Sequence, residues 1–284
     1  MERKNFLLGI FGFLFCLNIL AWIAVFEASR PSFLQVIFFD IGQGDAIFIV
    51  SPQGHQILID GGPGSKILEK LAKEMPFYDR SLDLVILTHP EKDHMEGLIE
   101  VLKKYEVDYI LWTGIVRDTL EFKEWQESLG KEKTQIKIAK AGQKIIASKV
   151  VFDILHPFEK LEGRKFKDSN NTSIVAKLSF GENSFLFTGD IYSSREKKLV
   201  ERGDDLNSDV LKVSHHGSKS SSCEQFIEKV SPDIAVLQLG RKNPYGHPHR
   251  EVLERLEKYE IEILRIDELG DIKIVSDGTK LYKR

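Results

Sequence analysis

Four side chains that could bind a metal ion stand within six residues of the sequence: His89, Glu91, Asp93 and His94. They lie in the segment Thr88–His94, directly after the apolar run Leu84–Leu87. Such a loop can wrap around a cation, because alternate residues point to one side and the last one opens the next helix. A polar turn with Asp93 near a helix N-terminus is the simpler alternative, but turns of that kind rarely need two imidazoles. The segment therefore favours metal-dependent chemistry.

Three further polar segments are rich in histidine and aspartate. They are Thr188-Gly189-Asp190, Ser214-His215-His216-Gly217-Ser218 and Tyr245-Gly246-His247-Pro248-His249, and the first two follow apolar runs. Taken alone, an aspartate after a glycine is often only turn chemistry, and adjacent histidines can simply be exposed. Six of the eight histidines nevertheless lie in these segments and in Thr88–His94. Because open α/β sheets place their sites at strand ends, the four segments together predict a single site.

The composition is that of a folded protein with a large core. The chain has 284 residues, of which 42% are hydrophobic and 29% charged, with a formal net charge of −3. These values exclude a disordered, collagen-like or coiled-coil chain. The near-neutral charge gives no direct sign of a nucleic-acid partner, although it leaves room for a local basic cleft. The two cysteines, Cys16 and Cys223, form neither a disulfide framework nor a CxxC metal motif.

The N-terminus carries the longest apolar run of the chain. Phe6–Phe26 is uncharged over 21 residues, and a helix of that length spans roughly 30 Å, the thickness of a bilayer core. Two basic residues precede it, so the positive-inside rule puts the N-terminus in the cytoplasm and the chain after about Ser29 outside. We expect an uncleaved, single-pass membrane anchor. A cleaved signal peptide, which would give a secreted protein, and a buried core helix are the alternatives.

From Phe33 onward, short apolar runs alternate with segments of helical spacing. Strands are predicted at 33–39, 46–50, 56–60, 84–87, 173–180, 184–188, 210–213, 234–237, 261–266 and 271–275, and helices at 65–74, 94–105, 194–201, 224–230 and 250–259. No linker rich in proline, glycine or serine divides this part of the chain. We therefore expect an anchor or signal over residues 1–30 and one α/β domain over residues 31–284.

Seven short motifs follow one another along this domain. They are Phe39-Asp40-Ile41-Gly42-Gln43-Gly44-Asp45-Ala46, Ile59-Asp60-Gly61-Gly62, the Thr88–His94 segment, Asn170-Asn171-Thr172-Ser173, Thr188-Gly189-Asp190, Val213-Ser214-His215-His216-Gly217-Ser218 and Asn243-Pro244-Tyr245-Gly246-His247-Pro248. On these motifs the chain resembles the metallo-β-lactamase superfamily, and within it the metal-binding domain of ComEC-like competence proteins, over roughly residues 34–275. The resemblance implies an αββα sandwich, with two packed sheets and helices on both outer faces, here preceded by one N-terminal transmembrane helix.

The resemblance also implies metal ligands. His89 and Glu91 match ligands of a first metal ion, Asp93 and His94 match ligands of a second, and Asp190 matches a carboxylate that bridges the two. The last metal-binding histidine is matched by His215, with its neighbour His216 as an almost equal candidate. The implied cofactor is one or two divalent cations, Mn²⁺ or Zn²⁺.

Other matching residues are expected to support the metal or the substrate. Asp60 resembles a carboxylate that orients the histidine loop, and His247 a residue at the cleft mouth that contacts a scissile phosphate or donates a proton. The supporting or substrate-binding candidates are Asp60, Asn170, Asn171, His216 and His247, and the candidates for a direct catalytic part are Asp93, His216 and His247.

Two departures from the superfamily pattern bear on the metal. Glu91 stands where the wider superfamily has a histidine, and Asn170-Asn171 stands where another histidine is expected. Both changes replace nitrogen by oxygen ligands, which favours harder ions such as Mn²⁺ over Zn²⁺. They also weaken the first site, so a single-metal enzyme is an alternative. Either way, the implied reaction is metal-assisted hydrolysis.

Three functions are compatible with these residues. We expect a membrane-anchored phosphodiesterase that cleaves DNA, most simply single-stranded DNA, outside the cytoplasmic membrane. Cations that could contact the phosphates are Arg164, Lys165, Lys167 and Lys219. Aromatic residues that could stack on the bases are Trp112 and Tyr245. A hydrolase of lactones, thioesters or β-lactams and a non-catalytic surface binding module are the alternatives. ComEC-like proteins carry a multi-spanning channel region, whereas this chain has one hydrophobic segment. A role in competence or DNA uptake would therefore need a channel from a separate protein.

Overall fold

The computed structural model describes residues 2–29, 33–130 and 134–284. It separates into an N-terminal unit and a domain that begins at Phe33. The N-terminal unit is helix α1 (Glu2–Ser29), whose apolar part, Lys4–Val25, has a mean hydropathy of 2.4 and no buried side chains. A helix this long and apolar is typical of a transmembrane span or of a signal sequence. The expected boundary between residues 30 and 31 falls on residues outside those described.

The strands of the domain form two sheets, each with a defined order. The first sheet runs β15 (Leu281–Lys283), β14 (Ile272–Ser276), β1 (Leu34–Phe38), β2 (Ile47–Val50), β3 (Gln56–Ile59), β4 (Ser81–Ile86), β5 (Glu106–Trp112), β6 (Gln135–Ile138). The second runs β13 (Glu262–Arg265), β12 (Ile234–Leu237), β11 (Val210–Lys212), β10 (Asn183–Phe187), β9 (Val175–Phe180), β8 (Val150–His156), β7 (Lys144–Ala147). Both sheets mix parallel and antiparallel pairs.

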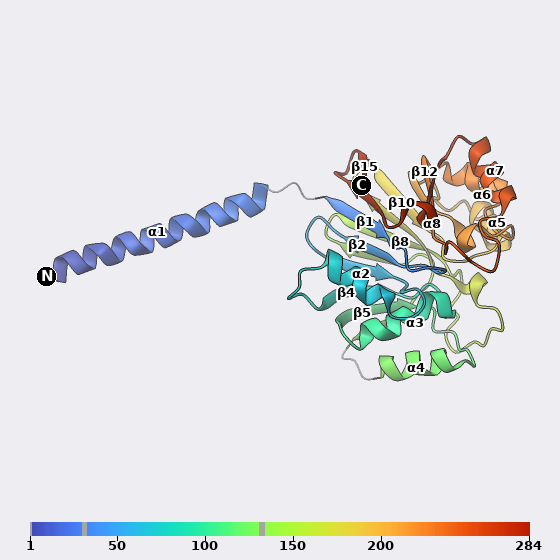
Figure 1. Ribbon diagram of the computed structural model, residues 1–284, viewed down its shortest axis with the longest axis horizontal. Helices are drawn as coiled ribbons and strands as arrows, with labels where there is room; N and C mark the ends of the chain where they lie inside the picture. Colours follow the sequence, from blue (N-terminus) through green and yellow to red (C-terminus); the bar gives the residue numbers. More distant parts are fainter. Residues whose placement is uncertain (1, 30–32, 131–133) are drawn as a thin grey trace. The chain divides into compact units, whose positions relative to one another are not determined.

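Helices cover the outer faces of both sheets (Figure 1). On the first sheet lie α2 (Lys66–Glu74), α3 (Lys92–Leu102) and α4 (Leu120–Leu129); on the second lie α5 (Ser193–Glu201), α6 (Glu224–Val230) and α7 (Arg250–Lys258). Shorter helical turns are η1 (Asn170–Thr172), η2 (Ser214–Gly217) and α8 (Ile266–Leu269). The predicted αββα sandwich is confirmed.

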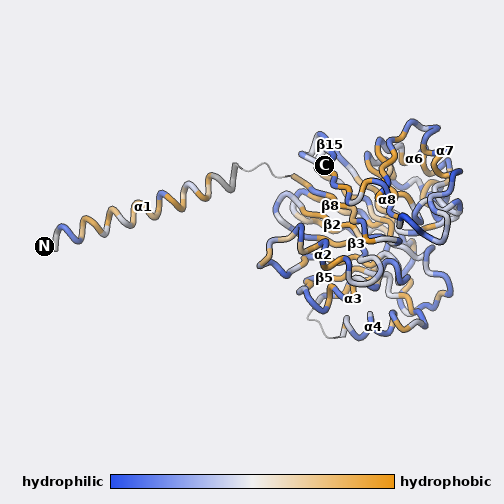
Figure 2. The backbone as a smooth tube through the Cα atoms, in the orientation of Figure 1, coloured by the Kyte–Doolittle hydropathy of each residue, from blue (hydrophilic) through white to orange (hydrophobic). Residues whose placement is uncertain are grey.

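Apolar side chains on both faces of the central strands hold the layers together. In β1, Val36 and Phe38 belong to the core between the sheets, while Ile37 packs beneath the helices of the first sheet. This alternation follows from the two-residue repeat of a strand, and burial on both faces explains the near-continuous apolar runs in the sequence. The apolar colouring of the central strands in Figure 2 follows the same pattern. The polar side chains that could bind a metal ion or a substrate are therefore expected in the loops at the strand ends.

Candidate metal centre

The predicted site residues emerge from loops at the carboxyl ends of neighbouring strands. Asp60 follows β3, and His89 follows β4, which pairs with β3 in parallel. On the second sheet, Asp190 follows β10, and His216 follows its parallel neighbour β11. Within each sheet the two parallel strands end at the same edge, and contacts between His94 and Asp190 join the loops of the two sheets. Segments far apart in the sequence are thus brought to one point.

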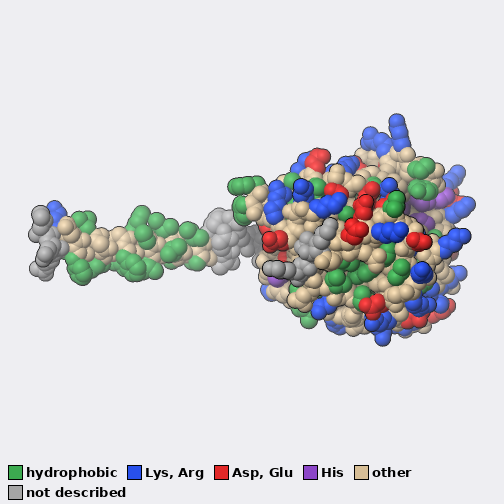
Figure 3. Space-filling model, turned by 90° about the horizontal axis from the view of Figure 1, so that it is seen from below, with side chains coloured by type: hydrophobic (Ala, Val, Ile, Leu, Met, Phe, Trp, Pro, Cys, Tyr) green, Lys and Arg blue, Asp and Glu red, His purple; other side chains and the backbone are tan. Residues whose placement is uncertain are grey.

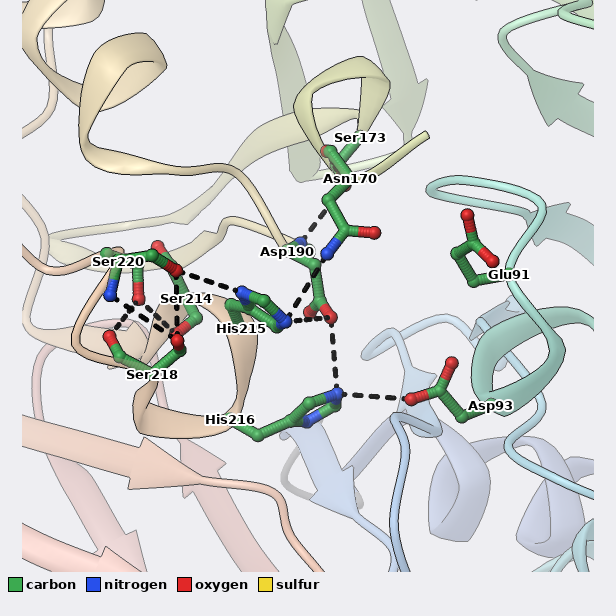
Figure 4. Close-up of polar contacts among 12 residues, drawn as sticks. Glu91, Asp93, Asn170, Ser173, Asp190, Ser214, His215, His216, Ser218 and Ser220 are labelled. Carbon is green, nitrogen blue, oxygen red and sulfur yellow. Dashed lines mark hydrogen bonds and ion pairs between the residues drawn. The ribbon is translucent and has the colours of Figure 1, made fainter. Parts of the chain in front are cut away.

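Five side chains form what we call the inner cluster: His89, Asp93, His94, Asp190 and His216. Potential ligand atoms of His89, His94 and Asp190 lie within 4.8 Å of one another, as do those of Asp93, His94 and His216. The Oδ2 atom of Asp190 lies 3.3 Å from Nε2 of His94 and 3.2 Å from Nε2 of His216. Figure 4 shows the His216 ring between the carboxylates of Asp190 and Asp93. Five residues spread between positions 89 and 216 of the sequence therefore meet at one buried point.

The inner cluster fits a divalent cation. The Nε2 atoms of His89, His94 and His216 are buried, and none makes a hydrogen bond of acceptable geometry within the described part of the chain. Buried polar atoms normally make hydrogen bonds, so three imidazole nitrogens that make none, grouped around one carboxylate, are suited to bind a metal ion. Imidazole nitrogen and carboxylate oxygen are the donors that Zn²⁺ and Mn²⁺ accept.

Hydrogen bonds behind the cluster set the orientation of the imidazoles. Asp60, which is fully buried, accepts hydrogen bonds from the backbone N–H of Thr88 (2.8 Å) and from its hydroxyl (2.6 Å). The Nδ1 atom of His94 lies 2.8 Å from Asp60 Oδ2. With Nδ1 bound to Asp60, Nε2 is the ring nitrogen of His94 that faces Asp190 and could bind a metal ion. Asp60 thus contacts both the start of the histidine loop and the ring of His94.

Two buried charged residues in the centre were not predicted from the sequence. The ammonium group of Lys212 forms an ion pair with Asp45 and lies 3.5 Å from Oδ1 of Asp190 and 3.0 Å from the carbonyl oxygen of Gly189. Lys212 and Asp45 are only 1% and 2% exposed. A lysine inside the apolar run Val210–Val213 was the signal that could have pointed to this ion pair. Lys212 occupies one oxygen of Asp190 and leaves the other facing the histidines.

The electrostatics of the cluster attract positive charge. Burial alone would lower the pKa of His94 and of His216, but Asp190 and the other carboxylates outweigh it and raise both pKa values well above their usual range. His89 is the exception: burial and the neighbouring His94 lower its pKa to about 3. The aspartates thus favour positive charge at this point, whether it comes from protons or from a metal ion.

Glu91 lies outside the inner cluster, although we expected it to be a ligand. Its carboxylate accepts a hydrogen bond from the Ser169 hydroxyl at 2.5 Å and lies 2.9 Å from the guanidinium of Arg117. It belongs to none of the potential ligand groups found among the described residues, and Figure 4 shows it apart from Asp190 and the histidines. Arg117 was not predicted, because nothing in its sequence surroundings links it to Glu91.

The two adjacent histidines point to different places. His215 and His216 both have a left-handed backbone, with φ values of 49° and 53°, which is uncommon for residues other than glycine. His216 enters the inner cluster, whereas Nε2 of His215 lies 4.0 Å from Asp190 and 3.3 Å from the side-chain amide of Asn170. The Nδ1 atom of His215 lies 3.4 Å from the Ser220 hydroxyl. The structure therefore brings His216 closer to the other candidates than His215.

The remaining candidates surround the cluster. The His247 ring is centred 5.6 Å from that of His215 and 6.2 Å from that of His216. Burial and the positive charge of His216 lower the pKa of His247 to about 4. The Asn171 side chain accepts a hydrogen bond from the backbone N–H of Tyr192 and lies 3.4 Å from the Ser194 hydroxyl, at the start of α5. Asn171 thus supports the wall of the site and does not point into the cluster.

Comparison with known proteins agrees with this geometry. Residues 39–241 match the sequence model of the "Metallo-beta-lactamase superfamily". The chain is 32% identical over 84% of its length to "ComE operon protein 3" of Bacillus subtilis, and 31% identical over 87% of its length to "Competence protein ComA" of Neisseria gonorrhoeae. It spans about a third of the length of these relatives (32% and 33%). Among solved structures, the metallo-beta-lactamase fold protein YhfI of Bacillus subtilis superposes with a TM-score of 0.56 at 13% identity, over 88% of this chain and 100% of that one, which supports the fold.

Proposed function

The chain belongs to the metallo-beta-lactamase superfamily, and from this premise we propose that it is a metal-dependent phosphodiesterase that cleaves single-stranded DNA. The observation that carries the proposal is the set of three buried imidazole nitrogens around Asp190, none of which makes a hydrogen bond within the described part of the chain. The name of one relative, a competence protein, favours DNA over lactones, thioesters or β-lactams as the substrate.

In this proposal His89, His94, Asp190 and His216 hold one or two divalent cations, Mn²⁺ or Zn²⁺, with Asp93 as a further ligand. When bound, a divalent cation makes water a nucleophile at neutral pH and neutralises charge on the reacting phosphate. Asp60 keeps the proton of His94 on Nδ1, and Lys212 holds Oδ1 of Asp190 so that Oδ2 faces the histidines. His216 takes the ligand role in preference to His215, since its Nε2 lies nearer to Asp190.

Residues around the inner cluster would bind the DNA strand. His247 stands next to His215 and His216, and its low pKa keeps it neutral, so it can donate or accept a hydrogen bond at a phosphate. Exposed cations are present on the loops that flank the inner cluster. Arg164 and Lys165 precede η1, and Lys219 follows η2. Figure 3 shows histidine side chains reaching the surface on the right, among lysine and arginine side chains.

We further propose that α1 anchors the hydrolase domain, residues 31–284, to the outer face of the cytoplasmic membrane. The support is the apolar stretch Lys4–Val25 and the basic residues that precede Phe6. In this arrangement the enzyme meets DNA outside the cytoplasm. A cleaved signal sequence would give a secreted enzyme with the same chemistry.

The test is cleavage of end-labelled single-stranded DNA by the full-length protein in detergent, supplied with Mn²⁺ or Zn²⁺. Asp190→Asn should reduce both metal binding and cleavage at least about 100-fold. Asp108→Asn, which changes an exposed aspartate of β5, is the matched control and should behave as wild type. Metal-loaded wild-type protein that leaves DNA intact would overturn the proposal in favour of a small-molecule hydrolase. Protein that binds no metal would instead indicate a binding module.

A further inference from the structure

A row of aromatic rings leads from the surface to the inner cluster. The ring of Tyr245 is centred 5.7 Å from that of His247, with 25° between the two planes. The His247 ring is in turn 6.2 Å from that of His216, with 29° between their planes. One imidazole therefore separates Tyr245 from a residue of the inner cluster.

Tyr245 is held in place although it is exposed. Its side chain is 62% exposed, so most of the ring surface beyond the contact with His247 faces solvent. The turn beneath it is fixed by Asn243, which accepts a hydrogen bond from the backbone N–H of His247 (2.9 Å) and donates one to its carbonyl oxygen (2.8 Å). Gly246 supplies the positive φ of 71° that the turn requires. An aromatic ring presented on a fixed turn loses little entropy when it binds a partner.

The other aromatic residue that the sequence suggested for stacking is unsuited to it. Trp112 is 8% exposed and packs in the core between the first sheet and its helices, against Phe122 and Trp125. Tyr245 instead stands beside the candidate metal centre, on the same loop as the exposed cation Lys242. A flat ring next to a cation is the combination with which proteins bind single strands, because every base has a π-face and every linkage a phosphate.

We propose that Tyr245 is a base-stacking residue, which receives the nucleobase next to the phosphate at the inner cluster. This inference rests on the proposed phosphodiesterase function and narrows its substrate. Bases in a duplex are already stacked on their neighbours and paired with the other strand. A stacking residue that is separated from the inner cluster by one imidazole therefore selects single-stranded or frayed DNA. Tyr245 would thus act on substrate binding and strand preference, with the metal chemistry left to the inner cluster.

The experiment measures binding and cleavage separately, with full-length protein and three fluorescent DNA probes. The probes are a short oligothymidylate, the same strand with abasic sites in place of the bases, and a blunt duplex. Binding is followed by fluorescence anisotropy with Ca²⁺ as the added metal, and cleavage with Mn²⁺ or Zn²⁺. The variants are Tyr245→Ala, Tyr245→Phe and, as a matched control, Tyr78→Ala, which removes a tyrosine that is 77% exposed and precedes β4, far from the strand ends that carry the site.

Loss of one stacked base predicts that Tyr245→Ala binds the oligothymidylate about 5- to 150-fold more weakly. Its KM for cleavage should rise accordingly, with kcat little changed. Tyr245→Phe and Tyr78→Ala should match wild type, and the abasic strand should bind wild type and Tyr245→Ala equally.

Two results would overturn the stacking role: unchanged binding of oligothymidylate by Tyr245→Ala, or an equal loss on the abasic strand. The phosphodiesterase proposal fails separately. If wild type shows the Tyr245-dependent preference for bases but cleaves no probe with either metal, stacking stands and the enzymatic function falls.

Discussion

His215 and His216 are adjacent and share the same unusual backbone conformation, yet they lie in different surroundings. His216 is 1% exposed, its Nδ1 lies 2.8 Å from the carbonyl oxygen of Gln238, and its Nε2 faces Asp190 without a hydrogen bond. The side chain of His215 is 21% exposed, and each of its ring nitrogens lies within 3.4 Å of a polar side-chain atom. The Nε2 atom of His216 thus faces the carboxylates of the inner cluster, whereas the ring nitrogens of His215 face Asn170 and Ser220.

The same difference separates Asp93 from Glu91. Asp93 Oδ2 faces Nε2 of His216 at 3.5 Å, whereas the carboxylate of Glu91 is bound by Arg117 and Ser169. We use the name rim for Glu91, His215, His247 and Tyr245, which surround the inner cluster. Residue type alone makes members of both groups look like metal ligands or catalytic groups. What distinguishes them is whether their polar atoms face the other potential ligands of the inner cluster or residues outside it.

Lys212→Met should produce the largest effect. It removes the cation that neutralises Asp45 and Asp190 but keeps all five residues of the inner cluster. The substitution leaves Asp45 and Asp190 buried without their cation, which typically costs about 3–5 kcal/mol of folding free energy. Urea unfolding of the metal-free protein, followed by tryptophan fluorescence, measures the loss. Lys219→Met removes an exposed lysine beside the rim and should leave the unfolding free energy unchanged. Equal stability of wild type and Lys212→Met would contradict the role given to this ion pair.

His156→Asn tests a buried histidine outside both groups. Burial lowers the pKa of His156 from 6.5 to about 4, and its Nδ1 lies 2.7 Å from the carbonyl oxygen of Ser173. Because the unfolded chain takes up the proton first, His156 contributes stability above pH 6.5 that is lost as the pH falls toward 4. The contribution amounts to up to about 3 kcal/mol. As the pH falls from 6.5 to 4, the unfolding free energy of His156→Asn should therefore decrease less than that of wild type. Metal binding at pH 7.5 should be the same in both proteins. An equal decrease in variant and wild type would refute the prediction.

Asp60→Asn should weaken metal binding while every ligand remains in place. The amide can no longer fix the proton of His94 as a carboxylate does, and losses of such support typically reduce metal affinity about 10- to 100-fold. Competition with a chromophoric chelator gives the affinities of wild type and variant. Asp79→Asn, at the opposite end of β4, is the control. An affinity within twofold of wild type would show that the orientation of His94 does not depend on Asp60.

Glu91→Gln should have the smallest effect. Since Arg117 and Ser169 already occupy the carboxylate, we expect the metal affinity to change by less than about threefold, in the range of surface ion-pair contributions. Arg117→Met releases Glu91 and is expected to leave the affinity unchanged or to raise it. A tenfold loss in Glu91→Gln, measured by the same chelator competition, would place Glu91 among the ligands and remove the distinction between rim and cluster.

Periodicity predicted one α/β domain with helices covering its sheets, because the central strands are buried on two faces and read as apolar runs. The division into two packed sheets came from the family resemblance. The sequence did not reveal β5 to β8 and α4, which lie between residues 106 and 156. In β7 exposed positions alternate with half-buried ones, in β8 buried positions alternate with half-buried ones, and β6 is largely exposed, so these strands lack a continuous apolar run. Helix α3 begins at Lys92, two residues before the predicted start, which puts Asp93 and His94 in its first turn.

The candidate site was predictable where ligand types cluster along the chain. His89, Asp93, His94 and Asp190 stand in such clusters, and the structure brings them together. The distance of Glu91 from the cluster and the buried ion pair of Lys212 depend on contacts between segments far apart in the sequence. The choice between His215 and His216 depends on side-chain direction within a turn of left-handed backbone. Spacing along one sequence contains no information on such contacts.

The most direct test of the account compares metal binding by His216→Asn and His215→Asn. Mn²⁺ titration of the full-length protein, with free Mn²⁺ followed by electron paramagnetic resonance, gives the affinity of each variant. We predict that His216→Asn lowers the affinity at least about 100-fold, while His215→Asn stays within about threefold of wild type. Loss of binding in His215→Asn with retention in His216→Asn would contradict the assignment of the inner cluster.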